Sequence, residues 1–209
     1  RLCHDNWGMP ESAQPPYRNP SQPLSIRVSD ALDRLSLEEK VAQITLLSPS
    51  TSPAEQQLVR EDGTIDETVA RRDFRHGVGQ LTRPADVGLD PEAMARVTQR
   101  LQEIAQENST LDIPAIRSEE CISGYMGRGG TIYPQSIGLA STWDPSLIET
   151  MADRIREQMR AVGAQQALSP VLDVGRDPRW GRIEETYGED PYLVAAMGSA
   201  FVRGLQGED

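Results

Sequence analysis

Residues 167–191 read ALSPVLDVGRDPRWGRIEETYGEDP, an apolar run that is followed directly by a turn crowded with arginines and carboxylates. The apolar part, 167–174, is typical of a buried strand. Unpaired charges beside a buried strand are costly, so the charges of 175–191 must pair with one another or hold a polar ligand. The stretch therefore predicts a strand that ends in a polar site.

Three helices are expected to begin at an Asp-Pro pair. Asp is a favoured N-cap residue, and Pro fits the first helical position because its missing N–H would be unpaired there. The three pairs are Asp90-Pro91, Asp144-Pro145 and Asp190-Pro191. The helices that they open are expected to end near Glu107, Val162 and Arg203. Gly163 and Gly204 then stand where a helix can end on a left-handed residue.

Apolar, strand-like segments alternate with these helices. We expect strands at 78–82, 113–117 and 167–174. The order strand, helix, strand, helix indicates parallel βαβ units, which form their sites at the carboxyl ends of the strands. Two polar clusters fall at such ends, Ser118-Glu119-Glu120 and the 175–190 turn. The pattern therefore predicts an α/β fold with one polar site.

The N-terminal third is less regular. Residues 1–24 hold five prolines and no periodicity, which favours an extended arm that wraps on something larger. A helix is expected over 25–35, and Ser36 with Glu39 forms a capping box that opens a second, short helix. The stretch 48–74 is polar and is expected to be an irregular excursion on the surface.

Composition excludes several classes of protein. The 209 residues carry a net charge of −11, which argues against a nucleic-acid partner because phosphate binding needs a basic surface. No apolar run approaches the roughly 18 residues of a membrane span. The first residues lack the pattern of a signal peptide, which slightly favours the cytoplasm, although the N-terminus can have been trimmed. Cys3 and Cys121 lie far apart in the sequence, which favours two unpaired thiols over a disulfide.

The first polar cluster contains two adjacent carboxylates. Neighbouring strand residues point in opposite directions, so only one of Glu119 and Glu120 can face a common centre. The alternative is that both are solvated loop acids. The glycines of 124–130 follow, but the Lys-Ser/Thr ending of a phosphate-binding loop is absent.

The second polar cluster offers three planar guanidinium groups. Arg176, Arg179 and Arg182 can bind carboxylates or vicinal hydroxyls. The alternative, expected for most of these residues, is an ion-pair network that fixes the loop. Its acidic members would be Asp173, Asp177, Glu184 and Glu185. The sequence has no Ser-His-Asp pattern and no metal-ligand spacing, so neither a metal nor a cofactor is expected.

These motifs resemble those of glycoside hydrolase family 3. The resemblance rests on DPRWGR at 177–182 and ETYGEDP at 185–191. LEEKVAQ at 37–43 and TIYP at 131–134 support it, in the family's order. It implies a TIM-like (β/α)8 barrel, of which this chain supplies about three βα units. Residues 25–209 would then be the incomplete, N-terminal part of the barrel domain.

The resemblance also implies an activity. Members of the family are retaining exo-glycosidases that remove a terminal β-linked sugar such as β-D-xylose or β-D-glucose. Glu120 and Arg182 match the acidic residue and the arginine that bind sugar hydroxyls in the −1 subsite. No catalytic residue is expected in this chain, because the segments that bear the nucleophile and the acid/base are not found in it. The implied partners are an oligosaccharide or glycoside substrate and the remainder of the same enzyme, on which we expect this piece to depend.

Two departures from the family pattern matter. Ser123 stands where the family often has His or Asn, so it receives no role. Glu120 stands where many glucosidases have Asp, and its additional methylene favours a pentose such as xylose over glucose. Two alternatives stay open: a non-catalytic carbohydrate-binding or scaffold half-barrel, and a family 3 phosphorylase or N-acetylhexosaminidase.

Overall fold

The strands of this chain are short and parallel. A computed structural model describes residues 14–49 and 58–207, and within them the strands form one four-stranded sheet in the order β1-β2-β3-β4. The strands are β1 (Leu46–Leu47), β2 (Gln80–Thr82), β3 (Ile116–Glu119) and β4 (Gln166–Ala167). Neighbouring strands are also consecutive in the sequence, which is the order of successive βα units in a barrel.

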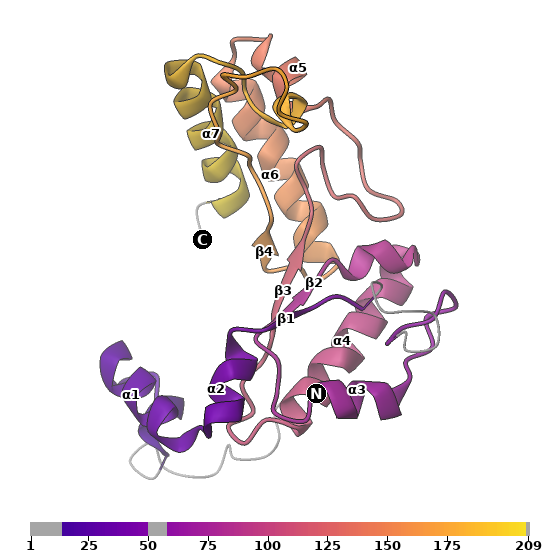
Figure 1. The fold of residues 1–209 in the computed structure, drawn as a ribbon, viewed down its shortest axis with the longest axis vertical. Helices are drawn as coiled ribbons and strands as arrows, with labels where there is room; N and C mark the ends of the chain where they lie inside the picture. The colour runs from indigo at the N-terminus through magenta and orange to yellow at the C-terminus, as the bar shows by residue number, and fades with distance from the viewer. Residues whose placement is uncertain (1–13, 50–57, 208–209) are drawn as a thin grey trace.

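The helices surround this sheet. They are α1 (Leu24–Arg34), α2 (Leu37–Gln43), α3 (Glu67–Asp73), α4 (Pro91–Glu107), α5 (Ser136–Ala140), α6 (Pro145–Ala161) and α7 (Pro191–Gln206). Figure 1 shows the sheet in the middle of an elongated molecule, with α6 and α7 side by side above it and α3 and α4 below it. None of the helices in the described ranges is long and apolar enough to cross a bilayer.

All three Asp-Pro helix starts are confirmed. The Asp90 carboxylate accepts the Ala93 N–H at 2.9 Å, and Asp144 and Asp190 cap α6 and α7 in the same way. Gly163, with φ +80°, ends α6 as expected.

The predicted helix end at Gly204 is wrong, because α7 continues to Gln206 and Gly207 follows it with φ +69°. A Cβ on Gly204 would lie 2.3 Å from the Glu149 carbonyl oxygen. Gly204 therefore allows α7 to approach α6 closely and does not end the helix.

The strand boundaries differ from the prediction, and so does the number of strands. The last strand leaves the ladder after Leu168, whose N–H donates to the Glu119 carbonyl at 2.9 Å. Pro170 has no N–H with which to continue the pairing. The sequence also missed β1, which raises the number of parallel strands in the described part of the chain from three to four. Two paired residues are too few to produce a pattern in the sequence.

The prediction that 48–74 is a surface excursion is wrong for its described part. Leu58, Val59 and Phe74 are buried, and α3 packs against α4. These residues belong to one of two apolar clusters, which also includes Leu81 and Leu101. The other cluster lies between α5, α6 and α7, together with residues of the loops that follow β3 and β4. The segment is polar on average, but a few of its apolar side chains pack into the core.

The described part of the N-terminal arm packs on its own chain. The Tyr17 N–H donates to Asp30 at 3.1 Å, and the Arg34 guanidinium lies over the Tyr17 ring at 5.7 Å. The arm therefore contacts α1, and a short 3-10 turn at Pro16–Arg18 interrupts its extended course. Residues 1–13, including Cys3, lie outside the described residues. Cys121 is free and buried.

The capping box before α2 is confirmed, and its contribution to stability should be measurable. The Ser36 hydroxyl accepts the Glu39 N–H at 3.2 Å, and the Glu39 carboxylate accepts the Ser36 N–H at 2.9 Å. Replacing Ser36 with alanine is expected to lower the free energy of unfolding by about 1 kcal/mol. Thermal unfolding would be compared with Glu38→Ala, which changes an exposed side chain in the same turn. Equal melting temperatures for the two variants would contradict a stabilising box.

Candidate active-site edge

The carboxyl ends of β2 and β3 are tied together by a buried carboxylate. Glu119, the last residue of β3, is 3% exposed, and its side chain accepts the Ala85 N–H at 2.8 Å. Ala85 lies in η4 (Pro84–Val87), the 3-10 turn that follows β2. Burial raises the pKa of Glu119 to about 7. The Glu119 side chain is therefore buried, and it holds the turn after β2 in place.

Glu120, the next residue, is only partly buried. Burial raises its pKa, whereas the positive charges of Arg83 and Arg182 oppose that rise. The two adjacent glutamates therefore differ, as the alternation of side chains along a strand requires. Glu119 holds the turn after β2, and Glu120 lies at the carboxyl end of the sheet, where two arginines act on it electrostatically.

Arg182 comes to this edge from the loop after β4. Its guanidinium forms two hydrogen bonds with the Glu185 carboxylate, at 2.9 and 2.5 Å, and its side chain is 57% exposed. Glu120 and Asp173 also interact with it electrostatically. Glu120 and Arg182 are far apart in the sequence, but in the structure they lie near enough to interact electrostatically.

Arg83 is a residue of this edge that sequence reasoning missed. It directly follows β2, with φ 49° and ψ 48°, and its N–H donates to the Ser118 carbonyl at 2.8 Å. Its side chain pairs with Asp86 at 3.4 Å and is a source of positive charge acting on Glu120. The available signal was its position, because it follows the 78–82 strand just as Glu120 follows the next strand.

The remaining charges of 175–191 do not form the expected network. Arg179 pairs with Asp177 at 2.6 Å, two positions away, and Arg182 pairs with Glu185. Within the ranges that the structure describes, Arg176 and Glu184 have no ion pair. The prediction is therefore correct for two local pairs and wrong for a connected network, because each pair joins residues only two or three positions apart.

Backbone and apolar contacts hold the loop instead. The Gly175 N–H donates to the Gly188 carbonyl at 2.8 Å, which joins the two ends of the loop. Thr186 and Tyr187 are buried beneath it. Trp180 is 38% exposed, so it lies at the surface of the loop.

The glycine-rich turn after Glu120 serves close packing. A Cβ on Gly124, which has φ +100°, would lie 2.0 Å from the Thr131 carbonyl oxygen. The Ser123 hydroxyl donates to the Gln135 side chain at 3.0 Å. This turn folds back on itself and does not form an anion cradle. Across the described ranges, no group of His, Cys, Asp and Glu is arranged to hold a metal ion.

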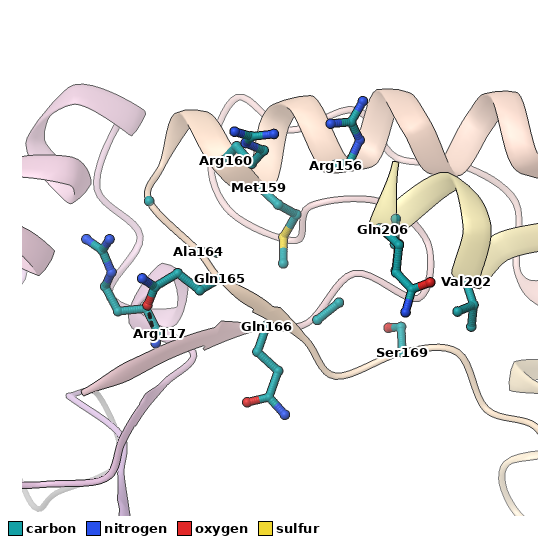
Figure 2. Close-up of a pocket in the computed structure, with 13 residues that line it drawn as sticks. Arg117, Arg156, Met159, Arg160, Ala164, Gln165, Gln166, Ser169, Val202 and Gln206 are labelled. Carbon is teal, nitrogen blue, oxygen red and sulfur yellow. Dashed lines mark hydrogen bonds between the residues drawn. The ribbon is translucent and has the colours of Figure 1, made fainter. Parts of the chain in front are cut away.

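A cavity of about 710 Å³ lies elsewhere (Figure 2), along β4 and beneath α6 and α7. Its polar lining includes Arg117, whose N–H donates to the Gln165 side chain at 3.2 Å, and Gln166. In the described chain β4 pairs with β3 alone, so this cavity follows the outer edge of the sheet. It includes neither Glu120 nor Arg182, and the polar edge at the carboxyl ends remains the better candidate site.

Parallel strands in sequential order, each followed by a helix, with charged groups gathered at the carboxyl ends, define a (β/α)-barrel class of protein. Residues 36–209 match the family model described as Glycosyl hydrolase family 3 N terminal domain. The chain therefore belongs to glycoside hydrolase family 3.

Individual relatives agree with this assignment. The chain is 46% identical over 123 residues to a protein of Formosa agariphila named Beta-xylosidase, covering 56% of this chain and 16% of that protein. It is 31% identical to the Periplasmic beta-glucosidase/beta-xylosidase of Dickeya chrysanthemi, covering 91% of this chain and 30% of that one. The solved structure of a β-glucosidase from Erythrobacter marinus is similar with a TM-score of 0.77 and 30% identity, covering 94% of this chain and 25% of that one. The chain thus spans less than a third of the length of each.

Proposed function

We propose that this chain forms one side of the −1 sugar subsite of an exo-acting, retaining β-glycosidase. In this proposal residues 25–209 are the N-terminal part of the barrel domain, and 1–24 are an arm outside it. The single observation that carries the proposal is that Glu120 and Arg182 both lie at the carboxyl ends of the parallel strands, near enough to interact electrostatically.

The two residues can recognise a sugar by complementary hydrogen bonding. The Glu120 carboxylate accepts hydrogen bonds from sugar hydroxyls, and the Arg182 guanidinium donates to them. Such charge-assisted bonds accelerate hydrolysis when they strengthen in the oxocarbenium-like transition state. The nucleophile and the acid/base are proposed to lie in the remainder of the same enzyme.

We propose xylose as the preferred sugar over glucose. A glutamate extends one methylene further than an aspartate, and in the subsite that length occupies space that a hydroxymethyl group would need. A pentose lacks this group. The name of the relative at 46% identity, Beta-xylosidase, supports the same preference.

The proposal is tested on the complete enzyme with nitrophenyl glycosides. We expect cleavage of β-xyloside with a higher kcat/KM than β-glucoside, and retention of the β-configuration when the first product is followed by NMR. Parallel assays with N-acetyl-β-glucosaminide, and with and without phosphate, separate hydrolysis from the activities of a hexosaminidase or phosphorylase. Cleavage of neither xyloside nor glucoside would overturn the proposal.

A further inference from the structure

We propose that Arg83 is a third sugar-binding residue of the same subsite, which donates hydrogen bonds from its guanidinium to the hydroxyls of the terminal sugar beside Glu120. This inference rests on the proposed function. It concerns the cation that directly follows β2, on the strand paired with the one that leads into Glu120.

The turn that bears Arg83 is held in place by the neighbouring strand. The Arg83 N–H bonds to the Ser118 carbonyl, and two residues later the Ala85 N–H bonds to the buried Glu119 side chain. One backbone contact and one side-chain contact thus fix the turn against β3. Arg83 is therefore anchored at its backbone immediately beside the residue that precedes Glu120.

The backbone of Arg83 suggests that its side chain has a use. Its φ of 49° lies in the left-handed region, where a residue with a Cβ is disfavoured and glycine is not. Strained conformations of this kind cluster at functional sites. A glycine would form this turn at lower cost, so the presence of an arginine points to a role for its side chain.

The charges around Arg83 leave its guanidinium available. Its ion pair with Asp86 is long, at 3.4 Å, and its side chain is 39% exposed. The positive charges of Arg83 and Arg182 both act on Glu120. A sugar hydroxyl between these groups could accept from an arginine while it donates to the carboxylate.

Replacing Arg83 with glycine in the complete enzyme separates binding from folding. Glycine accepts the left-handed backbone, so the melting temperature is expected to be equal or higher. The kcat/KM for nitrophenyl β-xyloside is expected to fall roughly 10- to 100-fold, as for loss of a charged hydrogen bond. Arg83→Lys keeps the positive charge but lacks the planar guanidinium, so its kcat/KM is expected to lie between those of Arg83→Gly and the wild type.

A matched control comes from Asp112→Gly. Asp112 also has a left-handed backbone, with φ 53°, but it lies before β3, toward the amino ends of the strands. Its replacement is expected to leave kcat/KM unchanged. A kcat/KM for Arg83→Gly within twofold of wild type, in a folded enzyme, would overturn the proposal.

Failure of the proposed function can be told apart from failure of this inference. If the wild-type enzyme cleaves no glycoside, binding of methyl β-xyloside measured by saturation-transfer NMR takes the place of kcat/KM. Roughly tenfold weaker binding in Arg83→Gly would then support a sugar-binding Arg83. Equal binding in both proteins, or no binding of methyl β-xyloside or methyl β-glucoside by the wild type, would overturn it.

Discussion

Replacement of Glu120 by alanine is expected to lower the kcat/KM of the complete enzyme by roughly 100-fold or more, since a charged hydrogen bond lost at the transition state costs on the order of 3 kcal/mol. The loss should exceed that expected for Arg83, because Glu120 interacts electrostatically with both Arg83 and Arg182. Removing it takes away a negative charge on which both arginines act, although each keeps its own carboxylate partner. Steady-state kinetics with nitrophenyl β-xyloside measure the effect.

Two further variants serve as an isosteric replacement and as a control. Glu120→Gln keeps the size of the side chain but removes its charge, so it is expected to retain most of the stability and little of the activity. Glu184→Ala removes an exposed carboxylate of the 175–191 loop and should leave kcat/KM unchanged. An unaltered rate in Glu120→Ala would mean that Glu120 is only a loop acid.

The second large effect is a fall in stability as the pH rises, caused by Glu119. Its pKa is raised from 4.5 to about 7 in the folded protein, so the folded state holds a proton that the unfolded state has lost. The stabilising contribution is complete below about pH 4.5 and is lost as the pH rises through about 7. A shift of this size corresponds to on the order of 3 kcal/mol.

Glu119→Gln tests this directly, because glutamine can still accept the Ala85 N–H without any charge. The variant is expected to match the wild type near pH 5 and to melt at a higher temperature near pH 8. Burial is the main cause of the raised pKa, the negative charges of Asp86 and Glu120 add to it, and the positive charge of Arg83 opposes it. Salt screens only the charges, so it should reduce the difference in melting temperature between the two proteins only in part. If the two proteins differed in melting temperature by the same amount at every pH, a buried, titrating Glu119 would be contradicted.

Much of the fold followed from short-range patterns. The Asp-Pro pairs and the Ser36 capping box were predictable because a helix cap depends on residues within about four positions of one another. The alternation of strands and helices predicted a parallel sheet. Errors arose where distant contacts decide the outcome: Phe74 buries a segment that reads as polar, and Gly204 packs against α6 inside a continuing helix.

Some residues of the candidate site were likewise indicated by the sequence, and others were not. Glu120 and Arg182 could be selected from motifs at expected strand ends, although their role in sugar binding stays a prediction. Arg83 was missed although it follows an expected strand, because only the pairing of β2 with β3 shows that it lies beside the segment that leads into Glu120. The ion-pair network expected in 175–191 failed because the sequence shows which charges are present but not which of them share a surface.

The sequence by itself determined the family, the parallel α/β class and the places where helices begin, because each depends on residues that are near one another along the chain. The tertiary structure alone decided that Glu119 turns inward to hold the Ala85 turn while Glu120 remains at the polar edge. It also decided that a backbone bond between Gly175 and Gly188, and not paired charges, closes the arginine-rich loop. These features depend on strand register and burial, which join residues that are distant along the chain.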